Sequence, residues 1–391
     1  MAVVRVGFDH TVRQGGVLQT VVVRGGGAGA VLGGPIRSHY VGRRFAPPEN
    51  LDGALCSVLM LGMGLKGVDR LHVEGPLSIE AVRNARAYQE AWVDLMPKLY
   101  HPVEVTADQV VHTPAALRQR AISAYSGGLD SAFTAARHGK RLLGAASYPL
   151  THVLLIHGLD VRLRDTAGLR AVTERVRPAL EELGLELIVV RSNLLAPNPR
   201  RPMPQRYYYS HAAQFAGVFH GLSAVFGYAL IASGQPYVGI DLRHGTNPAT
   251  DHLLSGGRMQ IVHDGAGHIR TQKAELVARF PALTRSLRVC FTPPPGNCGV
   301  CEKCVRTRLN FMATGAPDPA CFDQPFEEGM IDRMDAWNTT IPTELRSIAA
   351  YARGRGIAAP WVDRLEARAA FLEANPGSDE SHLRALGWVP Q

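Results

Sequence analysis

The feature that most constrains the fold is the stretch Ser126-Gly127-Gly128-Leu129-Asp130-Ser131, which lies between two segments of different character. The apolar residues 121–125 before it predict a strand, and the Ala-rich residues 132–137 after it predict a helix. The two glycines allow a tight turn with exposed N–H groups, and the helix points its positive end at the same place. With hydroxyls at both ends of the turn, this order predicts a phosphate-binding loop.

The stretch lacks the Gly-x4-Gly-Lys-Ser/Thr pattern of a Walker loop. Ser-Gly-Gly-x-Asp-Ser after a strand instead resembles the PP-loop of the ATP pyrophosphatases. This resemblance implies that 126–131 hold the β,γ-pyrophosphate of ATP with Mg²⁺, that AMP passes to a substrate oxygen and that pyrophosphate is released. The alternative is a Gly-Ser turn that binds no ligand.

Strands and helices alternate after this turn, which predicts an α/β protein with a doubly wound parallel sheet. Residues 151–156, 185–190 and 229–232 are expected strands, and 166–183 and 210–226 are expected helices. Ligands bind such sheets at the carboxyl ends of the strands. His157 and Gly158 end one strand and are candidate nucleotide-binding residues, although His157 also fits a turn histidine with only local partners. Ser233-Gly234-Gln235 ends another strand and is a candidate pocket edge.

The regions on either side of this unit differ from it, so we predict three parts. Residues 1–117 are expected to form an α+β domain of unknown role, with helices over 54–65 and 79–95. Residues 118–322 are the expected PP-loop domain, in which the irregular segment 240–270 is the natural place for substrate contacts. Residues 323–391 read as a helical extension, with helices over 342–353 and 359–374.

Four of the six cysteines lie close together and predict a metal site. Cys290, Cys298, Cys301 and Cys304 supply four soft ligands with no open position, which is typical of structural zinc. An iron–sulfur cluster can also use four cysteines and stays an alternative. Lys303 and Arg306 are expected to offset the negative charge of this site. The other two cysteines, Cys56 and Cys321, are expected to be buried thiols.

The combination of PP-loop and cysteine pattern over 118–322 resembles the 7-cyano-7-deazaguanine synthases. The matching stretches are Cys298-Gly299-Val300-Cys301-Glu302-Lys303-Cys304-Val305-Arg306, Gly315-Ala316-Pro317-Asp318-Pro319 and Thr271-Gln272-Lys273-Ala274-Glu275-Leu276. The resemblance implies ATP and zinc as cofactors, an acyl-adenylate intermediate and ammonia as nucleophile. That family converts a carboxylate on a deazapurine to an amide and then to a nitrile.

The acceptor region departs from the pattern of that family. Pro204-Gln205-Arg206-Tyr207 stands where the family has Pro-Gly-Arg-Asn, and no Asp-x3-Tyr-Pro-Asp-Cys-Arg segment follows Ser233. We therefore expect a small carboxylate or a modified, even macromolecular, acceptor. Asp130, Lys273 and Arg206 are the candidate catalytic residues. Lys273 would balance phosphate charge, unless it is a solvated helix lysine, and Arg206 would grip a carboxylate.

Composition limits the partners. The chain has 42 basic and 34 acidic residues, a formal charge of +8 that suits an anionic ligand such as ATP. The basic residues are scattered, which makes nucleic acid a less favoured partner. No apolar run reaches the ~18 residues of a membrane span and residues 1–7 show no signal sequence, so we expect a cytoplasmic protein. A tRNA-thiolating PP-loop enzyme and a non-catalytic ATP-binding module are the alternatives, and the added regions could dock a second copy or a protein partner.

Overall fold

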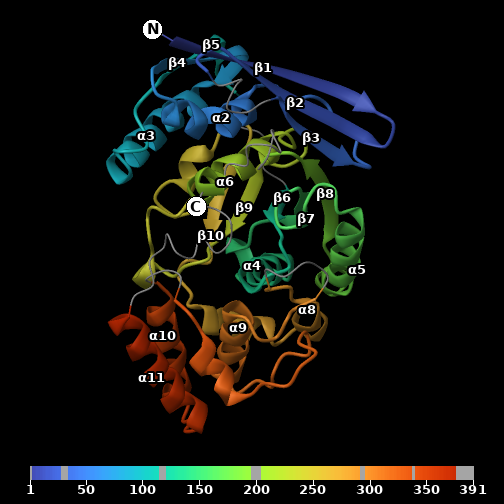
Figure 1. Ribbon diagram of the computed structural model, residues 1–391. Coiled ribbons are helices and arrows are strands. Elements are labelled where there is room, and N and C mark those ends of the chain that lie inside the picture. Colours follow the sequence, from blue (N-terminus) through green and yellow to red (C-terminus); the bar gives the residue numbers. More distant parts are fainter. Residues whose placement is uncertain are drawn as a thin grey trace.

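The computed structural model describes residues 2–27, 34–113, 120–194, 204–290, 296–336 and 340–375, without the side chains of 204–207. Its centre is a ten-stranded sheet in the order β10-β9-β6-β7-β8-β3-β2-β1-β4-β5 (Figure 1). The pairs β8–β3, β3–β2 and β2–β1 are antiparallel, and the other neighbouring pairs are parallel. The predicted α/β class, with a largely parallel sheet flanked by helices, is confirmed.

The parallel half of the sheet carries the turn 126–131. Its strands are β6 (Ala121–Ala124), β7 (Leu150–His157), β8 (Glu186–Ser192), β9 (Tyr228–Ala232) and β10 (Gln260–Asp264), and its helices are α4 (Leu129–Gly139), α5 (Thr166–Leu183) and α6 (Pro204–His220). The chain runs outward from β6 to β8 and then returns to place β9 on the other side of β6. The carboxyl ends of β6 and β9 therefore form a topological switch point, where sheets of this kind bind ligands.

Helices cover both faces of this half. Apolar side chains of α4 and α5 pack with one set of residues of β6, β7 and β9 in one core cluster. Those of α6 and α2 (Asp52–Gly64) pack with other residues of the same strands, Ile122, Leu154, Ile156, Ala229 and Ile231, in a second cluster. Because successive strand residues face opposite sides, strands buried on both faces must be apolar throughout, as 151–156 are.

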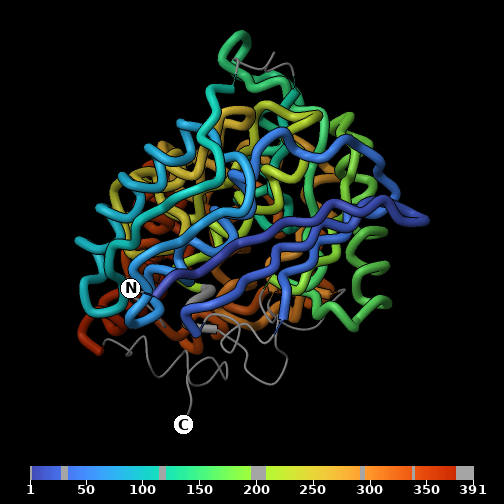
Figure 2. The backbone as a smooth tube through the Cα atoms, turned by 90° about the horizontal axis from the view of Figure 1, so that it is seen from above, coloured from blue at the N-terminus to red at the C-terminus, as the bar shows by residue number. Residues whose placement is uncertain are grey.

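The N-terminal region extends the same sheet. Its strands are β1 (Ala2–Arg13), β2 (Gly16–Arg24), β3 (Ile36–Val41), β4 (Val68–Ser78) and β5 (Glu104–Val111), and its second helix is α3 (Ile79–Leu95). Strand β3 pairs with β8 through Ser38↔Ser192 and Tyr40↔Val190. Figure 2 shows the long N-terminal strands, in dark blue, lying across the top of the molecule. Residues 1–117 thus share both a sheet and an apolar core with the region after them.

Helix α2 and Ser78 fix this region against the rest of the chain. Helix α2 approaches α6 closely, and a Cβ on Gly53 would lie 2.8 Å from the Gly217 carbonyl oxygen. Ser78 caps α3 by accepting a hydrogen bond from Ala81 N. It also donates through N and Oγ to the buried carboxylate of Asp52, while Gly257 N donates to Ser78 Oγ at 2.9 Å. The segment after β9 is therefore tied to the N-terminal region.

The C-terminal third is helical and packs beneath the sheet (Figure 1). Its helices are α7 (Arg270–Val277), α8 (Pro281–Ser286), α9 (Glu302–Met312), α10 (Thr340–Gly354) and α11 (Pro360–Ala374). The described part of the chain also has short 3₁₀ turns, η1 (Gly144–Ala146), η2 (Tyr237–Gly239), η3 (Asp251–Leu254) and η4 (Glu328–Arg333). Helices α9, α10 and α11 enclose a third apolar cluster with η4. Among the described helices, none combines the length and apolarity of a membrane span.

Two expected elements differ from the structure. The helix expected over 210–226 begins at Pro204 and ends at His220, because a proline is well tolerated in a first helical turn and Gly221 follows the last one. The segment 240–270, expected to be irregular, contains the short strand β10, which pairs with β9. Only five residues long, with His263 and Asp264 in it, β10 shows no alternation that the sequence would reveal.

Candidate nucleotide and metal sites

The turn 126–131 has the strand–turn–helix order that the sequence predicts. Strand β6 ends at Ala124, Gly127 adopts φ +79°, and α4 begins at Leu129 with Gly128 at its N-cap. Gly128 N donates to Ser126 Oγ at 3.2 Å, and Ser131 Oγ donates to the Gly128 carbonyl at 3.0 Å. The two hydroxyl oxygens lie 3.4 Å apart, so they sit together beside the positive end of α4.

Arg288 holds the turn 126–131 through hydrogen bonds to its backbone carbonyls. Its backbone N donates to the Gly127 carbonyl at 2.8 Å, its Nε donates to the Ser126 carbonyl at 3.2 Å, and its Nη2 lies 2.9 Å from Asp160. These contacts hold the carbonyl groups of Ser126 and Gly127 in place. Arg288 was not predicted, because no motif in the sequence links it to Ser126, which lies 162 residues earlier.

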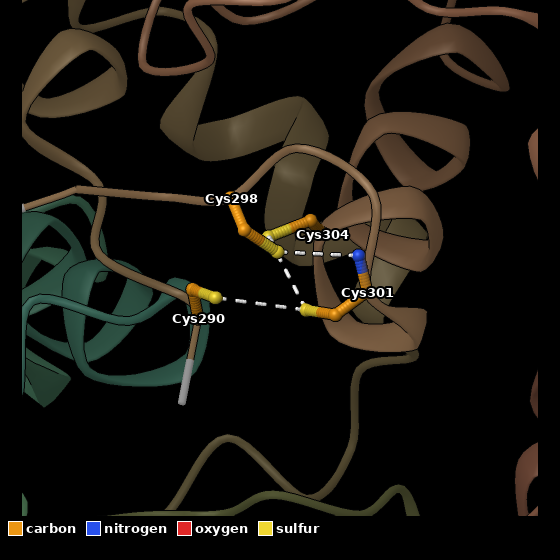
Figure 3. A group of neighbouring side chains, drawn as sticks. All are labelled: Cys290, Cys298, Cys301 and Cys304. Atoms are coloured by element: carbon orange, nitrogen blue, oxygen red, sulfur yellow. Dashed lines mark hydrogen bonds between the residues drawn. The ribbon is translucent and has the colours of Figure 1, made fainter. Parts of the chain in front are cut away.

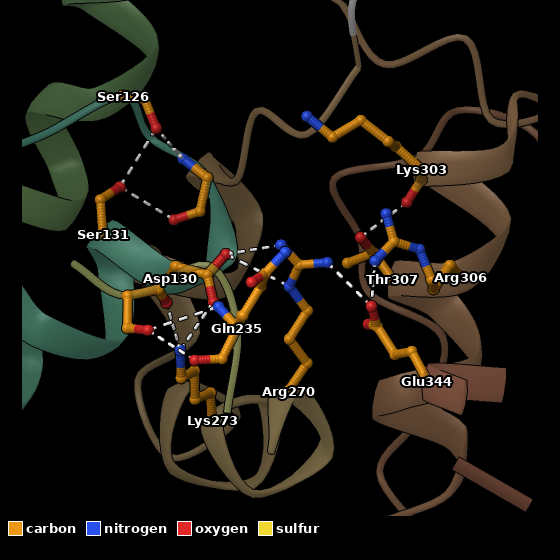
Figure 4. A network of polar contacts seen from close by, with 12 residues as sticks. Ser126, Asp130, Ser131, Gln235, Arg270, Lys273, Lys303, Arg306, Thr307 and Glu344 are labelled. Carbon is orange, nitrogen blue, oxygen red and sulfur yellow. Dashed lines mark hydrogen bonds and ion pairs between the residues drawn. The ribbon is translucent and has the colours of Figure 1, made fainter. Parts of the chain in front are cut away.

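Asp130 meets two cations of helix α7 (Figure 4). Lys273 Nζ lies 2.9 Å from Oδ1, and Arg270 Nε and Nη2 lie 3.2 and 3.1 Å from Oδ2. Burial alone would raise the pKa of Asp130, but the charges of Arg270 and Lys273 outweigh burial and hold it well below its usual value. Asp130 is therefore an ionised acceptor at neutral pH and not a proton donor.

Lys273 is buried, and this excludes the alternative of a solvated helix lysine. Its side chain is 1% exposed, and Nζ also donates to the Ser233 carbonyl at 2.5 Å. Ser233 N in turn donates to the Asp264 carbonyl at 2.7 Å. Lys273 thus connects the turn after β6 to the carboxyl end of β9, across the switch point of the sheet.

A chain of ion pairs continues from Asp130 into the C-terminal extension (Figure 4). Arg270 Nη1 lies 3.0 Å from Glu344, a residue of α10, and Glu344 also pairs with Arg306 of α9. Arg306 pairs in addition with Glu302. Two carboxylates thus bind the Arg306 guanidinium, and the expectation that Arg306 offsets the charge of the cysteine cluster stays a prediction. Nothing in the sequence pointed to Glu344.

Lys303 is a further cation near Arg270 and Arg306, and it lies on helix α9. Burial and the nearby charges of Arg270 and Arg306 lower the pKa of Lys303 to about 8. In Figure 4 its side chain extends from α9 toward the side on which Ser126 lies. Three cations placed this close together repel one another, and an anion between them and the turn would relieve that repulsion.

His157 and Gly158 have a local structural role. His157 is buried and its Nε2 donates to the Arg162 carbonyl at 2.8 Å. Gly158 has φ +117°, and a Cβ there would lie 1.8 Å from the Ser192 carbonyl oxygen. Only glycine fits this approach of the chain to the end of β8. These contacts give both residues partners within the loop after β7, and no described contact joins them to the turn 126–131.

The second candidate region lies around the start of α6. Arg206 is in the first turn of this helix, and its side chain lies outside the described residues. Gly245 N donates to the Tyr208 carbonyl at 3.0 Å, and the His244 ring is 5.1 Å from the Tyr208 ring and 4.9 Å from the His211 ring. The structure thus brings the start of α6, which carries Arg206, close to the segment 240–270, where substrate contacts were expected.

The four predicted ligands Cys290, Cys298, Cys301 and Cys304 come together in one group (Figure 3). All four sulfur atoms lie within 4.8 Å of one another. Contacts within the group are 3.7 Å for Cys290–Cys301, 3.9 Å for Cys298–Cys304 and 3.4 Å for Cys301–Cys304. Sulfurs bound tetrahedrally at about 2.3 Å from zinc lie about 3.8 Å apart, so the group could hold a metal ion such as zinc.

Chemistry and position also suit a closed metal centre. Hydrogen bonding between Cys301 and Cys304 lowers the pKa of the Cys301 thiol and raises that of the Cys304 thiol, so of this pair Cys301 loses its proton more readily. Cys301 is the N-cap of α9, so a metal there would set the position of the helix that carries Lys303 and Arg306.

Asn297 shapes the loop between the cysteines and was missed by the sequence analysis. It is buried, its Nδ2 donates to the carbonyls of Leu287 and Cys321 at 3.0 Å each, and its Oδ1 accepts from Val289 N at 2.9 Å. The only sequence signal was its place directly before Cys298. Cys321 and Cys56 are both buried, as expected.

Comparisons with known proteins add no family to these sites: no protein-family model, no curated protein and no solved structure matches the chain.

Proposed function

We propose that the chain is an ATP-dependent, AMP-forming C–N ligase of the PP-loop type, related in mechanism to the 7-cyano-7-deazaguanine synthases. One observation carries this proposal: the buried Lys273 and the partly buried Arg270 join Asp130 beside the turn 126–131, at the switch point of a parallel sheet. A glycine turn at a helix N-terminus with ionised and cationic groups next to it suits the phosphates of a nucleotide.

The chemistry assigned to these residues is positional and electrostatic. A carboxylate oxygen of the substrate attacks the α-phosphorus of ATP, the bond to the β-phosphate oxygen breaks, and pyrophosphate leaves with that electron pair. The N–H groups of the turn and the hydroxyls of Ser126 and Ser131 bind the departing pyrophosphate, and Lys303 adds positive charge from the facing helix. Mg²⁺, when bound, neutralises phosphate charge, and the ionised carboxylate of Asp130 is the ligand that fits it.

The acyl group of the adenylate then passes to ammonia or another amine. The acceptor side is assigned to the region where Tyr208, His211 and His244 meet, with Arg206 at the start of the same helix. Since the family's Asn and its Asp-Cys-Arg segment have no counterpart here, the free 7-carboxy-7-deazaguanine acid would lose several hydrogen bonds. Losses of this kind cost orders of magnitude in rate, so we expect poor formation of the nitrile from that acid by the chain alone.

The metal has a structural role in this proposal. A closed four-cysteine zinc site has no position for substrate, so it would act by fixing α9 and the cations on it. The thiolation alternative is disfavoured by the two remaining cysteines. Burial raises the pKa of Cys321 to about 12 and also raises that of Cys56, so neither thiol is a ready nucleophile at neutral pH.

Formation of AMP and pyrophosphate from ATP, measured across a panel of carboxylates, tests the proposal. We expect carboxylate-dependent AMP formation by the wild-type chain and its loss in Ser126→Ala. Ser123→Ala is the matched control, because Ser123 is buried in β6 and its hydroxyl bonds, among the described residues, to backbone carbonyls of β6 and β9. Normal turnover by Ser126→Ala would show that the active site is elsewhere. ATP binding without AMP formation from any carboxylate would favour the non-catalytic module.

A further inference from the structure

A buried histidine near the carboxyl end of β10 has a defined tautomer. His263 Nδ1 lies 2.8 Å from Oδ2 of Asp251, whose side chain is fully buried. Asp251 also accepts hydrogen bonds from Thr246 Oγ1 at 2.5 Å and Asn247 N at 3.1 Å. Because the Asp251 oxygen is an acceptor, the ring nitrogen that faces it is the donor, so in the neutral ring Nδ1 carries the proton and Nε2 carries the lone pair.

This lone pair has no hydrogen-bond partner among the described residues, and the side chain is only 5% exposed. An unpaired buried acceptor destabilises a fold, so its presence is not explained by stability. The opposite face of the same strand provides a contrast. His138 Nε2 bonds to Asp264 at 3.1 Å and its Nδ1 accepts from Tyr148 N at 3.1 Å, so both of its nitrogens are used. The His138 pair is structural, whereas the His263 pair leaves one basic atom for a ligand.

The position of this pair is next to the proposed site. His263 precedes Asp264, whose carbonyl accepts from Ser233 N, and the Ser233 carbonyl accepts from Lys273. Thr246, which donates to Asp251, lies two residues after His244, whose ring contacts the rings of Tyr208 and His211. The pair therefore belongs to the edge of the site formed by the loop after β9.

The proposed reaction needs a proton acceptor there. Ammonium and alkylammonium ions must lose a proton before the nitrogen can attack an acyl-adenylate. Asp130 and Glu344 are poor acceptors, because each is bound by two cations that keep it ionised. A histidine whose Nδ1 is held by a carboxylate suits this task.

We propose that His263, oriented by Asp251, takes the proton of the amine in the second half-reaction; this assignment rests on the proposed ligase function. The amine nitrogen forms a C–N bond to the acyl carbon, and the C–O bond to the AMP phosphate breaks. AMP leaves with that electron pair, and the amine proton goes to His263 Nε2 and then to solvent. Asp251 is a positioning residue that holds the ring and stabilises the imidazolium formed.

The two half-reactions can be measured apart. Carboxylate-dependent exchange of labelled pyrophosphate into ATP reports adenylate formation, with 7-carboxy-7-deazaguanine and a carboxylate panel as probes. Transfer to ammonium chloride and to hydroxylamine reports the second step. Hydroxylamine is largely unprotonated at neutral pH and needs no base before it attacks. In His263→Gln we expect exchange within about twofold of wild type, and amide formation from ammonium lower by about 100-fold. We expect hydroxamate formation to be largely retained, and Asp251→Asn to show the same pattern more weakly.

His138→Gln is the matched control, since it removes a buried histidine bonded to a carboxylate on the other face of β10. We expect it to change both steps to the same extent. A parallel fall of exchange and amide formation in both His263→Gln and Asp251→Asn, or an equal loss with hydroxylamine, would show a structural role and overturn the assignment. Wild-type protein without any carboxylate-dependent exchange would instead overturn the ligase function, and the assignment with it.

Discussion

Replacing Cys301 with serine tests whether a metal holds the C-terminal half together. Cys301 Sγ lies 3.7 Å from Cys290 and 3.4 Å from Cys304, so its loss removes a central ligand and leaves three thiols with one side open. The metal would crosslink the segment 290–304. Closing a loop of about 15 residues stabilises a fold by about 3 kcal/mol. For a cooperative unit of 150–250 residues, that loss lowers the melting temperature by roughly 6–12 °C.

The assay combines metal analysis with local stability. Wild-type protein should contain about one zinc per chain, and Cys301→Ser should lose it. Hydrogen exchange should then rise in α9 and α10 while the strands β1–β5 stay protected. Cys321→Ala is the control, because its buried thiol lies outside the cluster. Retention of zinc by Cys301→Ser, an iron–sulfur absorption band or a wild-type chain without metal would each refute the reasoning.

Three further predictions follow from single residues. Lys303→Met should weaken ATP binding about tenfold, or about 1.4 kcal/mol. It should not lower the melting temperature of the ligand-free protein, because burial, Arg270 and Arg306 disfavour the Lys303 cation more than Asp160 and Glu302 favour it. Calorimetry and thermal melting measure the two effects, and an unchanged affinity would contradict the prediction. Gly158→Ala should lower the unfolding free energy, measured by urea titration, by about 3 kcal/mol or more, because its Cβ would overlap the Ser192 carbonyl oxygen. Gly184→Ala has open space around the new Cβ and should cost only about 1–2 kcal/mol in the same titration. The folded-state pKa of Asp130 lies below its unfolded value of 3.8, so its ion pairs stabilise the protein above about pH 4 and this contribution is lost as the pH falls; Asp130→Asn should flatten that acid limb, and an unaltered limb would exclude Asp130 as its source.

The sequence predicted those features that depend on neighbouring residues. Helix α5 begins at Thr166 and ends at Leu183 as expected, because its apolar spacing is regular and Gly184 supplies a left-handed C-cap. Helix α3 begins after Ser78 because that side chain caps it. The cysteine cluster was predictable for the same reason, since its three later ligands lie within a few residues on one loop and helix end.

The missed features depend on contacts between distant segments. The pairing of β3 with β8 joins residues about 150 positions apart, and nothing in either strand specifies its partner. Strand β10 exists because β9 offers it an edge. In the candidate site, Lys273 was found through a motif, but Glu344 belongs to a helix that reads as an ordinary amphipathic extension. Its position between two arginines is set by the packing of α10 against α9, which no local pattern encodes.

The ion-pair chain suggests why ATP would need a metal ion of its own in this site. Lys273, Arg270, Arg306 and Lys303 supply four positive charges, and Asp130, Glu344 and Glu302 supply three negative ones. The excess of one positive charge is far smaller than the charge of a triphosphate, so Mg²⁺ would have to carry the remainder. Most of the positive charge is thus paired with carboxylates that join helices α4, α7, α9 and α10 to one another. We therefore expect a nucleotide to bind weakly without Mg²⁺, and to bind more weakly still when loss of Cys301 frees the end of α9.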